Sequence, residues 1–242
     1  MKCIAFSREP AYTQGNMRKI AHSKPFLAVI IIILFIVGYI VYPRSPSPND
    51  IIPNPSPTLD TVTDIDGNVY KTVKIGNQVW MAENLKTTRL NDGQLIQYEP
   101  NNLDWANLRT PGYCWPNNDS SNKDDYGALY NWYAVNSGKL APIGWHVPTE
   151  DEWKILADFL GGEGVAGGKL KEMGFSVCWA GDRTYKGDFV LFNELEKYWT
   201  ATEGGWHPTD VWYRTITKLE SELGRSSHPK MDGHSVRCVK ND

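Results

Sequence analysis

The longest apolar stretch of the chain lies near its N-terminus. Residues 26–42 (FLAVIIIILFIVGYIVY) are seventeen positions without a charge. A helix rises about 1.5 Å per residue, so this stretch would cover roughly 25 Å, slightly less than a hydrocarbon core of about 30 Å. Tyr39 and Tyr42 lie where interfacial aromatic residues are expected, and Pro43 would end the helix. The pattern predicts one transmembrane helix at residues 26–42.

Beyond residue 60 the hydrophobic pattern changes to short β-like runs. Residues 69–75 and 78–81 are rich in β-branched and aromatic side chains, and the tight-turn pairs Asp66-Gly67 and Gly76-Asn77 precede each of them. These features predict a β-hairpin at the start of the domain. Later strands are expected in four runs of the same character, at residues 187–192, 198–203, 210–218 and 234–240. We expect the first and last strands to be neighbours.

Two segments have helical spacing. In the first, residues 126–136, four apolar positions share one face, and Asp124 or Asp125 would cap it. In the second, Thr149 is the natural N-cap and Glu152 follows three residues later, so the pair predicts a capping box. The acidic residues beside them are explained by this helix start, without a catalytic carboxylate pair. Two early helices followed by strands predict an α+β domain with an antiparallel sheet.

Charge sets the expected topology. Residues 1–25 hold five basic residues against Glu9 alone, a local charge of +4, and the positive-inside rule therefore places this segment in the cytoplasm. Residues 43–58 contain six prolines and predict an extended stalk over residues 43–59. One domain would follow at residues 60–242, in the periplasm or outside the cell. A cleaved signal peptide is the alternative, but the apolar run is long for one and no small-residue cleavage site follows.

The net charge of −3 for the whole chain leaves about −7 beyond residue 42, which excludes the basic footprint of a nucleic-acid-binding protein. No nucleophile elbow is present, and the four histidines beyond the membrane segment lack the H-E-x-x-H spacing of a zinc helix. The sequence therefore predicts no cofactor, no metal and no catalytic residues. The expected partners are the membrane and an external ligand.

Six motifs occur in order along the domain: DIDGNVYKTVKIGNQVWMAENLKTTR, YGALYNWYAVNSGKL, GWHVPTEDEW, AGGKLKE, YWTATE and HSVRCVK. With them, residues 61–240 resemble the Fibrobacter major paralogous domain, a family of secreted or surface-anchored bacterial modules. That family is in turn similar to the C-type lectin-like fold of formylglycine-generating enzymes. The resemblance implies a C-type lectin-like domain, and it implies little about chemistry because one fold hosts many functions.

Three cysteines lie beyond the membrane segment: Cys114, Cys178 and Cys238. An odd number allows at most one intrachain bridge among them, and the sequence does not say which pair would form it. Family members often have cysteine where this chain has Ala141, so the resemblance implies that the usual partner of Cys238 is absent. Thiol chemistry of the formylglycine-generating type is the enzyme alternative, although no basic cluster in the sequence marks any of these cysteines as activated.

Two turn-rich loops carry the residue types of a sugar-binding site, a flat aromatic ring beside amides and carboxylates. The first loop contains Trp115, Asn117, Asn118 and Asp119, and the second contains Trp206, His207 and Asp210. The alternative for each loop is that its tryptophan packs on the core. The sequence thus predicts a membrane-anchored binding or adhesion module, with a structural envelope protein that binds another protein as a further alternative.

Overall fold

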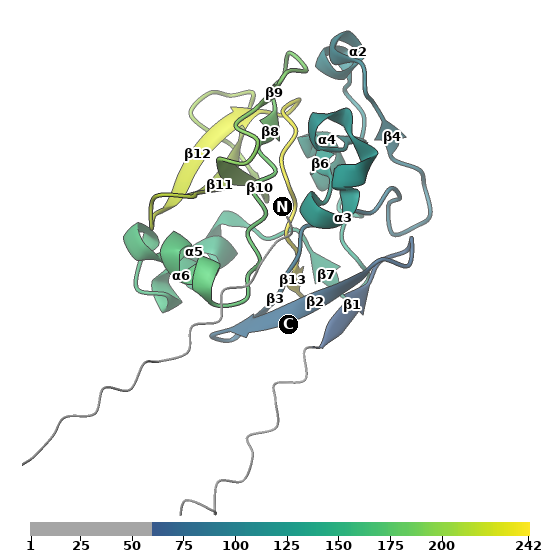
Figure 1. Cartoon of the computed structure of the whole chain (residues 1–242). Helices are drawn as coiled ribbons and strands as arrows, with labels where there is room; N and C mark the ends of the chain where they lie inside the picture. Colours follow the sequence, from purple (N-terminus) through teal and green to yellow (C-terminus); the bar gives the residue numbers. More distant parts are fainter. Residues whose placement is uncertain (1–59) are drawn as a thin grey trace, which may run out of the picture. The chain divides into compact units, whose positions relative to one another are not determined.

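A computed structural model describes residues 60–242 (Figure 1). The N-terminal segment, transmembrane helix and stalk expected over residues 1–59 lie outside the described residues. In the part of the chain that the structure describes, no helix has both the length and the apolar character needed to cross a bilayer. This part is a mixed arrangement of small β-sheets and short helices.

The N-terminal hairpin and the C-terminus meet in a five-stranded antiparallel sheet of order β1-β2-β3-β13-β7. The predicted hairpin is confirmed, with both of its strands at the expected residues. The expected pairing of the first and last strands is wrong. The predicted first strand, β2, pairs with β1 and β3, whereas Val239 of β13 lies opposite Trp80 of β3 and His146 of β7. The strands are β1 (Thr61–Thr63), β2 (Val69–Ile75), β3 (Gln78–Met81), β7 (Trp145–His146) and β13 (Val239–Lys240).

A second antiparallel sheet consists of β10 (Leu195–Glu203), β11 (Asp210–Thr217) and β12 (Leu223–Pro229). Helices α5 (Glu150–Phe159) and α6 (Glu163–Glu172) lie beside it, below the sheet in Figure 1. Trp153 and Leu156 of α5 share a buried cluster with Ile216 of β11 and Leu223 of β12. Burial of this apolar face against the sheet therefore holds α5 in place.

The predicted capping box of α5 is present. Glu152 donates its backbone N–H to Thr149 Oγ1 at 3.3 Å, and the Glu152 carboxylate accepts from the Thr149 N–H at 2.8 Å. The two side chains satisfy backbone donors that a helix N-terminus otherwise leaves without partners. The sequence pattern therefore located the first residue of this helix.

The single helix expected over residues 126–136 is wrong. The chain forms α3 (Lys123–Tyr126), β6 (Leu129–Tyr130) and α4 (Trp132–Asn136) instead. Gly127 has φ 76°, and a Cβ there would lie 2.7 Å from the Cβ of Asn84. Asn131 then caps α4 by accepting from the N–H of Ala134, and the same oxygen accepts from the N–H of Gly112. Contacts with distant segments thus break a stretch that has helical spacing.

The remaining elements complete the domain around α3 and α4. A small sheet of order β4-β5-β6 lies next to α4, and β8 pairs with β9 as a separate hairpin. Their bounds are β4 (Gln97–Tyr98), α2 (Asn102–Asn107), β5 (Gly112–Cys114), β8 (Asp182–Arg183) and β9 (Phe189–Val190), with 3-10 turns at Pro116–Asn118 and Ser120–Asn122.

A buried polar network joins three distant parts of the chain. The Arg237 guanidinium donates to Asn84 Oδ1 at 3.0 and 2.7 Å, and Asn84 Nδ2 donates to Glu196 Oε1 at 2.8 Å. Arg237 also lies over the ring of Phe175, with 4.3 Å between Cζ and the ring centroid. Asn84 belongs to the MAENL motif and Arg237 to the SVRCV motif. The two motifs therefore join the N-terminal and C-terminal parts of the domain through buried hydrogen bonds.

Candidate ligand-binding surface

The loop between β10 and β11 lies tightly against β12. A Cβ on Gly205 would come within 2.6 Å of the Asp210 Cβ and 2.7 Å of the Ser227 Cβ, so this approach requires glycine. The backbone N–H of Trp206 donates to Ser227 Oγ at 2.9 Å. The loop therefore fixes the backbone from which the Trp206 side chain projects.

The Trp206 side chain is exposed, and it rests on a second tryptophan. Trp206 is 69% exposed, and its ring centroid lies 5.1 Å from that of Trp212 on β11, with the planes at 79°. The guanidinium of Arg225 on β12 lies over Trp212, 3.4 Å from the ring centroid. We call Trp206, Trp212 and Arg225 the tryptophan platform. An exposed ring with such support is preorganised, because its conformation is restricted before any ligand arrives.

A buried carboxylate holds the cationic part of the platform. Glu150, the first residue of α5, accepts from Arg225 Nε and also from Nε and Nη2 of Arg214, at 3.2 and 3.1 Å. The side chain of Arg214 is 2% exposed and that of Glu150 is 11% exposed. The position of the Arg225 guanidinium is therefore set by the start of α5.

The second predicted loop contributes two of its three residues to this surface. Trp206 and His207 are exposed, whereas Asp210 is buried. The Asp210 carboxylate accepts from Ser227 Oγ at 3.2 Å. The backbone N–H of Asp210 donates to the carbonyl of His207. Asp210 therefore holds the loop on β12 rather than facing a ligand.

The first predicted loop is arranged differently. Trp115 is 7% exposed and packs in the main hydrophobic cluster, edge-on to Tyr113 at 5.2 Å. Asn117 and Asn118 have φ 56° and 55°, as in a turn; Asn118 donates to the carbonyl of Pro100. Asp119 accepts from the N–H and hydroxyl of Ser121. In this loop the tryptophan packs on the core, and the polar side chains stabilise the turn.

The free cysteines of residues 60–242 are buried. Cys114 and Cys238 are free thiols with no exposed surface, so no disulfide joins them to each other or to Cys178. Burial raises the pKa of the Cys114 thiol to about 12, although the nearby Arg183 acts in the opposite direction. Burial likewise raises the pKa of Cys238 far above its usual value. Both thiols are therefore protonated at neutral pH and are poor nucleophiles.

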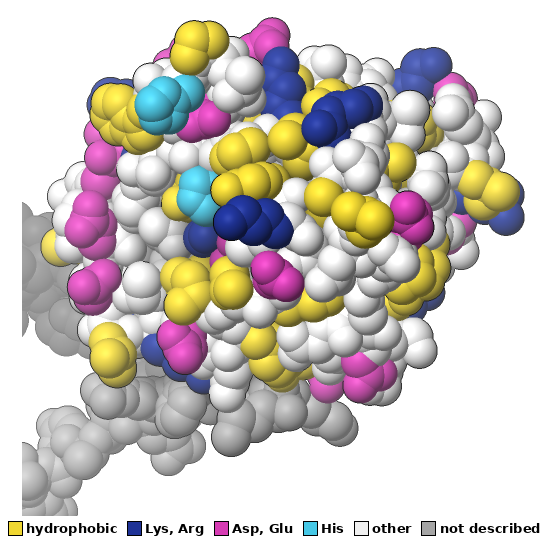
Figure 2. All heavy atoms as spheres, turned by 90° about the horizontal axis from the view of Figure 1, so that it is seen from above, with side chains coloured by type: hydrophobic (Ala, Val, Ile, Leu, Met, Phe, Trp, Pro, Cys, Tyr) yellow, Lys and Arg dark blue, Asp and Glu magenta, His cyan; other side chains and the backbone are white. Residues whose placement is uncertain are grey.

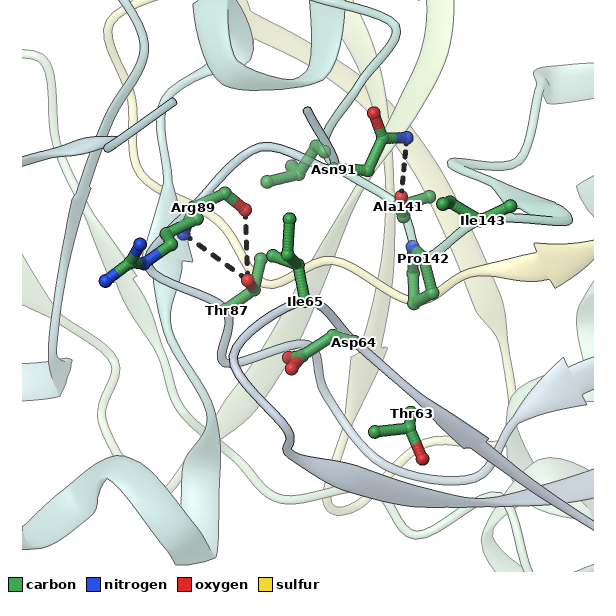
Figure 3. Close-up of a pocket in the computed structure, with 10 residues that line it drawn as sticks. Thr63, Asp64, Ile65, Thr87, Arg89, Asn91, Ala141, Pro142 and Ile143 are labelled. Atoms are coloured by element: carbon green, nitrogen blue, oxygen red, sulfur yellow. Dashed lines mark hydrogen bonds between the residues drawn. The ribbon is translucent and has the colours of Figure 1, made fainter. Parts of the chain in front are cut away.

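A small pocket lies between the β1–β2 turn and two loops (Figure 3). Its volume is about 180 Å³, below the roughly 300 Å³ at which pockets for drug-sized ligands begin. Its polar groups are satisfied within the protein: Asp64 accepts from Tyr70, and Asn91 donates to the carbonyl of Ala141. In Figure 3 the guanidinium of Arg89 points away from the hollow. This pocket offers little to orient a ligand.

Sequence reasoning missed two sets of residues. Trp212 and Arg225 support Trp206 from strands, and no motif marks their contact. The second set is His228, Asp232 and His234, which come together through a turn and therefore lack the helical spacing of a zinc motif. On the face shown in Figure 2, hydrophobic side chains reach the surface among basic, acidic and His side chains.

Comparison with known proteins gives one result. A family model described as the Fibrobacter succinogenes major domain matches residues 73–240. No curated protein and no solved structure matches the chain. The matched residues extend from β2 to β13 and include the whole tryptophan platform. They make up well over half of the chain, which therefore belongs to the Fibrobacter succinogenes major domain family.

Proposed function

We propose that this protein is a membrane-anchored recognition module that binds carbohydrate at the tryptophan platform. The observation that carries the proposal is the Trp206 ring, 69% exposed and braced against Trp212. A flat ring held in an exposed position can stack on the C–H face of a sugar.

The polar groups around the ring have the chemistry that sugar hydroxyls require. Arg225 uses Nε to donate to Glu150, so its Nη groups can donate to a ligand. His207 is exposed directly after Trp206 and can donate or accept. Because Glu150 already fixes Arg225, ordering this side chain costs little on binding.

The proposed location follows from the charge and hydropathy of the N-terminal region. Residues 1–25 would remain in the cytoplasm, residues 26–42 would span the membrane, and the stalk at residues 43–59 would present the domain in the periplasm or outside the cell. Protease added to spheroplasts should then digest the C-terminal domain. Protection of that domain until the membrane is dissolved would contradict the topology.

The fold that we propose for residues 60–242 is C-type lectin-like, related to that of formylglycine-generating enzymes. The mixed sheets and helices are compatible with that relation, and the sequence motifs support it.

A thiol oxidase receives less support, because Cys114 and Cys238 are buried and their pKa values are raised. A module that binds another envelope protein through the same surface is an outcome that the experiment below distinguishes.

The test is a glycan array probed with the full chain in detergent micelles. Binding should be lost in Trp206→Ala and partly retained in Trp206→Phe, which keeps a flat ring. Tyr185→Ala is the matched control, since Tyr185 is 43% exposed on the β8–β9 turn and outside the platform. Binding that survives Trp206→Ala, or no binding to any glycan, would overturn the proposal in favour of a protein partner.

A further inference from the structure

We propose that His228, Asp232 and His234 form a binding site for a divalent transition-metal ion of the zinc class. The three side chains lie where β12 ends and the chain turns back through residues 229–233. Each offers one ligand atom, and these atoms lie within 4.8 Å of one another. Two imidazole nitrogens and one carboxylate oxygen are a common ligand set for zinc, with one position left for water.

Hydrogen bonds orient the two imidazoles toward the cluster. His234 Nδ1 donates to the carbonyl of Gly233 at 3.0 Å. The neutral ring therefore has an unprotonated Nε2, whose lone pair can bind a metal ion. His228 Nε2 lies 3.3 Å from the hydroxyl of Tyr213, which leaves Nδ1 as the coordinating atom. Metal-binding histidines characteristically use the second ring nitrogen in this way, since the outer hydrogen bond fixes the ring.

The inward atoms lack partners among the described residues. His234 Nε2, Asp232 Oδ1 and His228 Nδ1 are buried and make no hydrogen bond there. His228 Nδ1 lies 2.7 Å from Asp232 Oδ2, but the two atoms are not aligned for a hydrogen bond. The residues His234 and Asp232 are 0% and 2% exposed. Unsatisfied buried polar atoms are costly, and a shared ion would satisfy all three together.

The charge balance of the cluster also favours a cation. Asp182, whose charge interacts with that of Asp232, is paired with Lys197 at 3.0 Å, with both side chains at least nine-tenths buried. The Lys197 ammonium also acts on His234, so two carboxylates and one ammonium leave the surroundings of the cluster with a net charge of −1. Within residues 60–242 that pairing leaves the buried carboxylate of Asp232 with His228 alone. A divalent ion would compensate the negative charge of Asp232, and neutral imidazoles would complete its coordination.

The geometry permits binding with small adjustments. Zinc bonds to nitrogen and oxygen are about 2.0–2.2 Å long, so ligand atoms of one ion stand about 3–4 Å apart. The His228 side chain is 29% exposed, whereas the Asp232 side chain is 4% exposed. The ion would therefore enter from the His228 side, where its open position faces solvent.

The test is zinc competition between a chromogenic chelator and the full chain in detergent micelles, after removal of metals. We expect one zinc ion per chain and a raised melting temperature. Affinity should be at least about tenfold lower in His228→Ala and Asp232→Asn, since the loss of even an outer-shell partner costs a metal site about 10- to 100-fold. His207→Ala is the matched control, because His207 is exposed and lies outside the cluster. Calcium should not compete, since it prefers oxygen ligands alone.

A second measurement on the wild-type chain covers the case in which a variant does not fold. Zinc should shift the imidazole ¹⁵N resonances of His228 Nδ1 and His234 Nε2 and leave those of His146 and His207 in place. The proposal is overturned if zinc does not bind, if His228→Ala binds it as tightly as the wild type, or if the shifts occur at other histidines. In each case His228 and Asp232 would be a structural ion pair.

Discussion

Arg214 and Arg225 lie directly opposite each other on β11 and β12, and both donate to the one carboxylate of Glu150. Two like charges in a cross-strand pair destabilise a sheet. Glu150 offsets that repulsion from the N-terminus of α5, where a carboxylate also interacts favourably with the helix dipole. The same side chain thus joins α5 to the sheet and positions the cation of the tryptophan platform.

Glu150→Ala should lower the free energy of unfolding by about 3–5 kcal/mol, because it leaves the buried guanidinium of Arg214 without its main acceptor. Urea unfolding followed by tryptophan fluorescence measures the change. Glu163→Ala is the control, since Glu163 also pairs with Arg214 but its side chain is 48% exposed. We expect that variant to lose no more than about 1 kcal/mol. Equal losses in the two variants would contradict the assigned role of Glu150.

The capping box makes a smaller and separable contribution. Thr149→Ala removes the acceptor for the N–H of Glu152 and should cost about 1 kcal/mol. Thr149→Ser keeps an equivalent hydroxyl and should remain within a few tenths of a kcal/mol of the wild type. The measurement is again the urea midpoint. If the alanine and serine variants were equally stable, the hydroxyl would not be what starts this helix.

Local signals in the sequence predicted the elements that depend on local physics. The first hairpin is set by its turn residues and alternating burial, and α5 is set by Thr149, Glu152 and its apolar stripe. β12 went unpredicted because its sequence, LGRSSHP, has few strand-forming residues. It is a strand because β11 supplies the pairing groups along its whole length. Tertiary context overrides weak local preference there.

Contacts between distant residues account for what the sequence did not indicate at the candidate sites. Trp206 and His207 were predicted from their turn-rich loop, and both are exposed. The loop around Trp115 is also turn-rich and polar, yet its tryptophan packs on Tyr113. Which way a tryptophan turns depends on the space beside it, and no pattern within one loop contains that information. The position of Arg225 also depends on other elements, because Trp212 lies on β11 and Glu150 on α5.

The buried thiols give a prediction on reactivity. Cys114 and Cys238 should remain unmodified when the folded chain is treated with iodoacetamide at pH 8, and both should react once urea unfolds it. Burial excludes the reagent, and the pKa of Cys114, raised to about 12, keeps the thiolate scarce. Peptide mass spectrometry measures the modification at each cysteine. Rapid labelling of either thiol in the folded chain would reopen the thiol-chemistry alternative.

Glu196 should give the folded chain a distinctive dependence on pH. Burial raises the pKa of its carboxyl above the usual 4.5, although hydrogen bonds from Ser235 and the N–H of Ala180 and the charge of Arg237 oppose the increase. The folded state therefore holds this proton more tightly than the unfolded chain does. The stabilisation that results is fully present below pH 4.5 and is lost as the pH rises through the raised value.

Glu196→Gln removes this titration. As the pH rises above 4.5, the free energy of unfolding of the wild type should therefore fall relative to that of the variant. Urea midpoints of both proteins from pH 4 to pH 8 give the two curves. Glu163→Gln is the control for the loss of one carboxylate. Its curve of urea midpoint against pH should follow that of the wild type more closely than the Glu196→Gln curve does. Wild-type and Glu196→Gln curves that run parallel throughout would show that Glu196 has the same proton affinity folded and unfolded. The hydrogen bonds from Ser235 and Ala180 and the charge of Arg237 would then fully offset the effect of burial on this pKa.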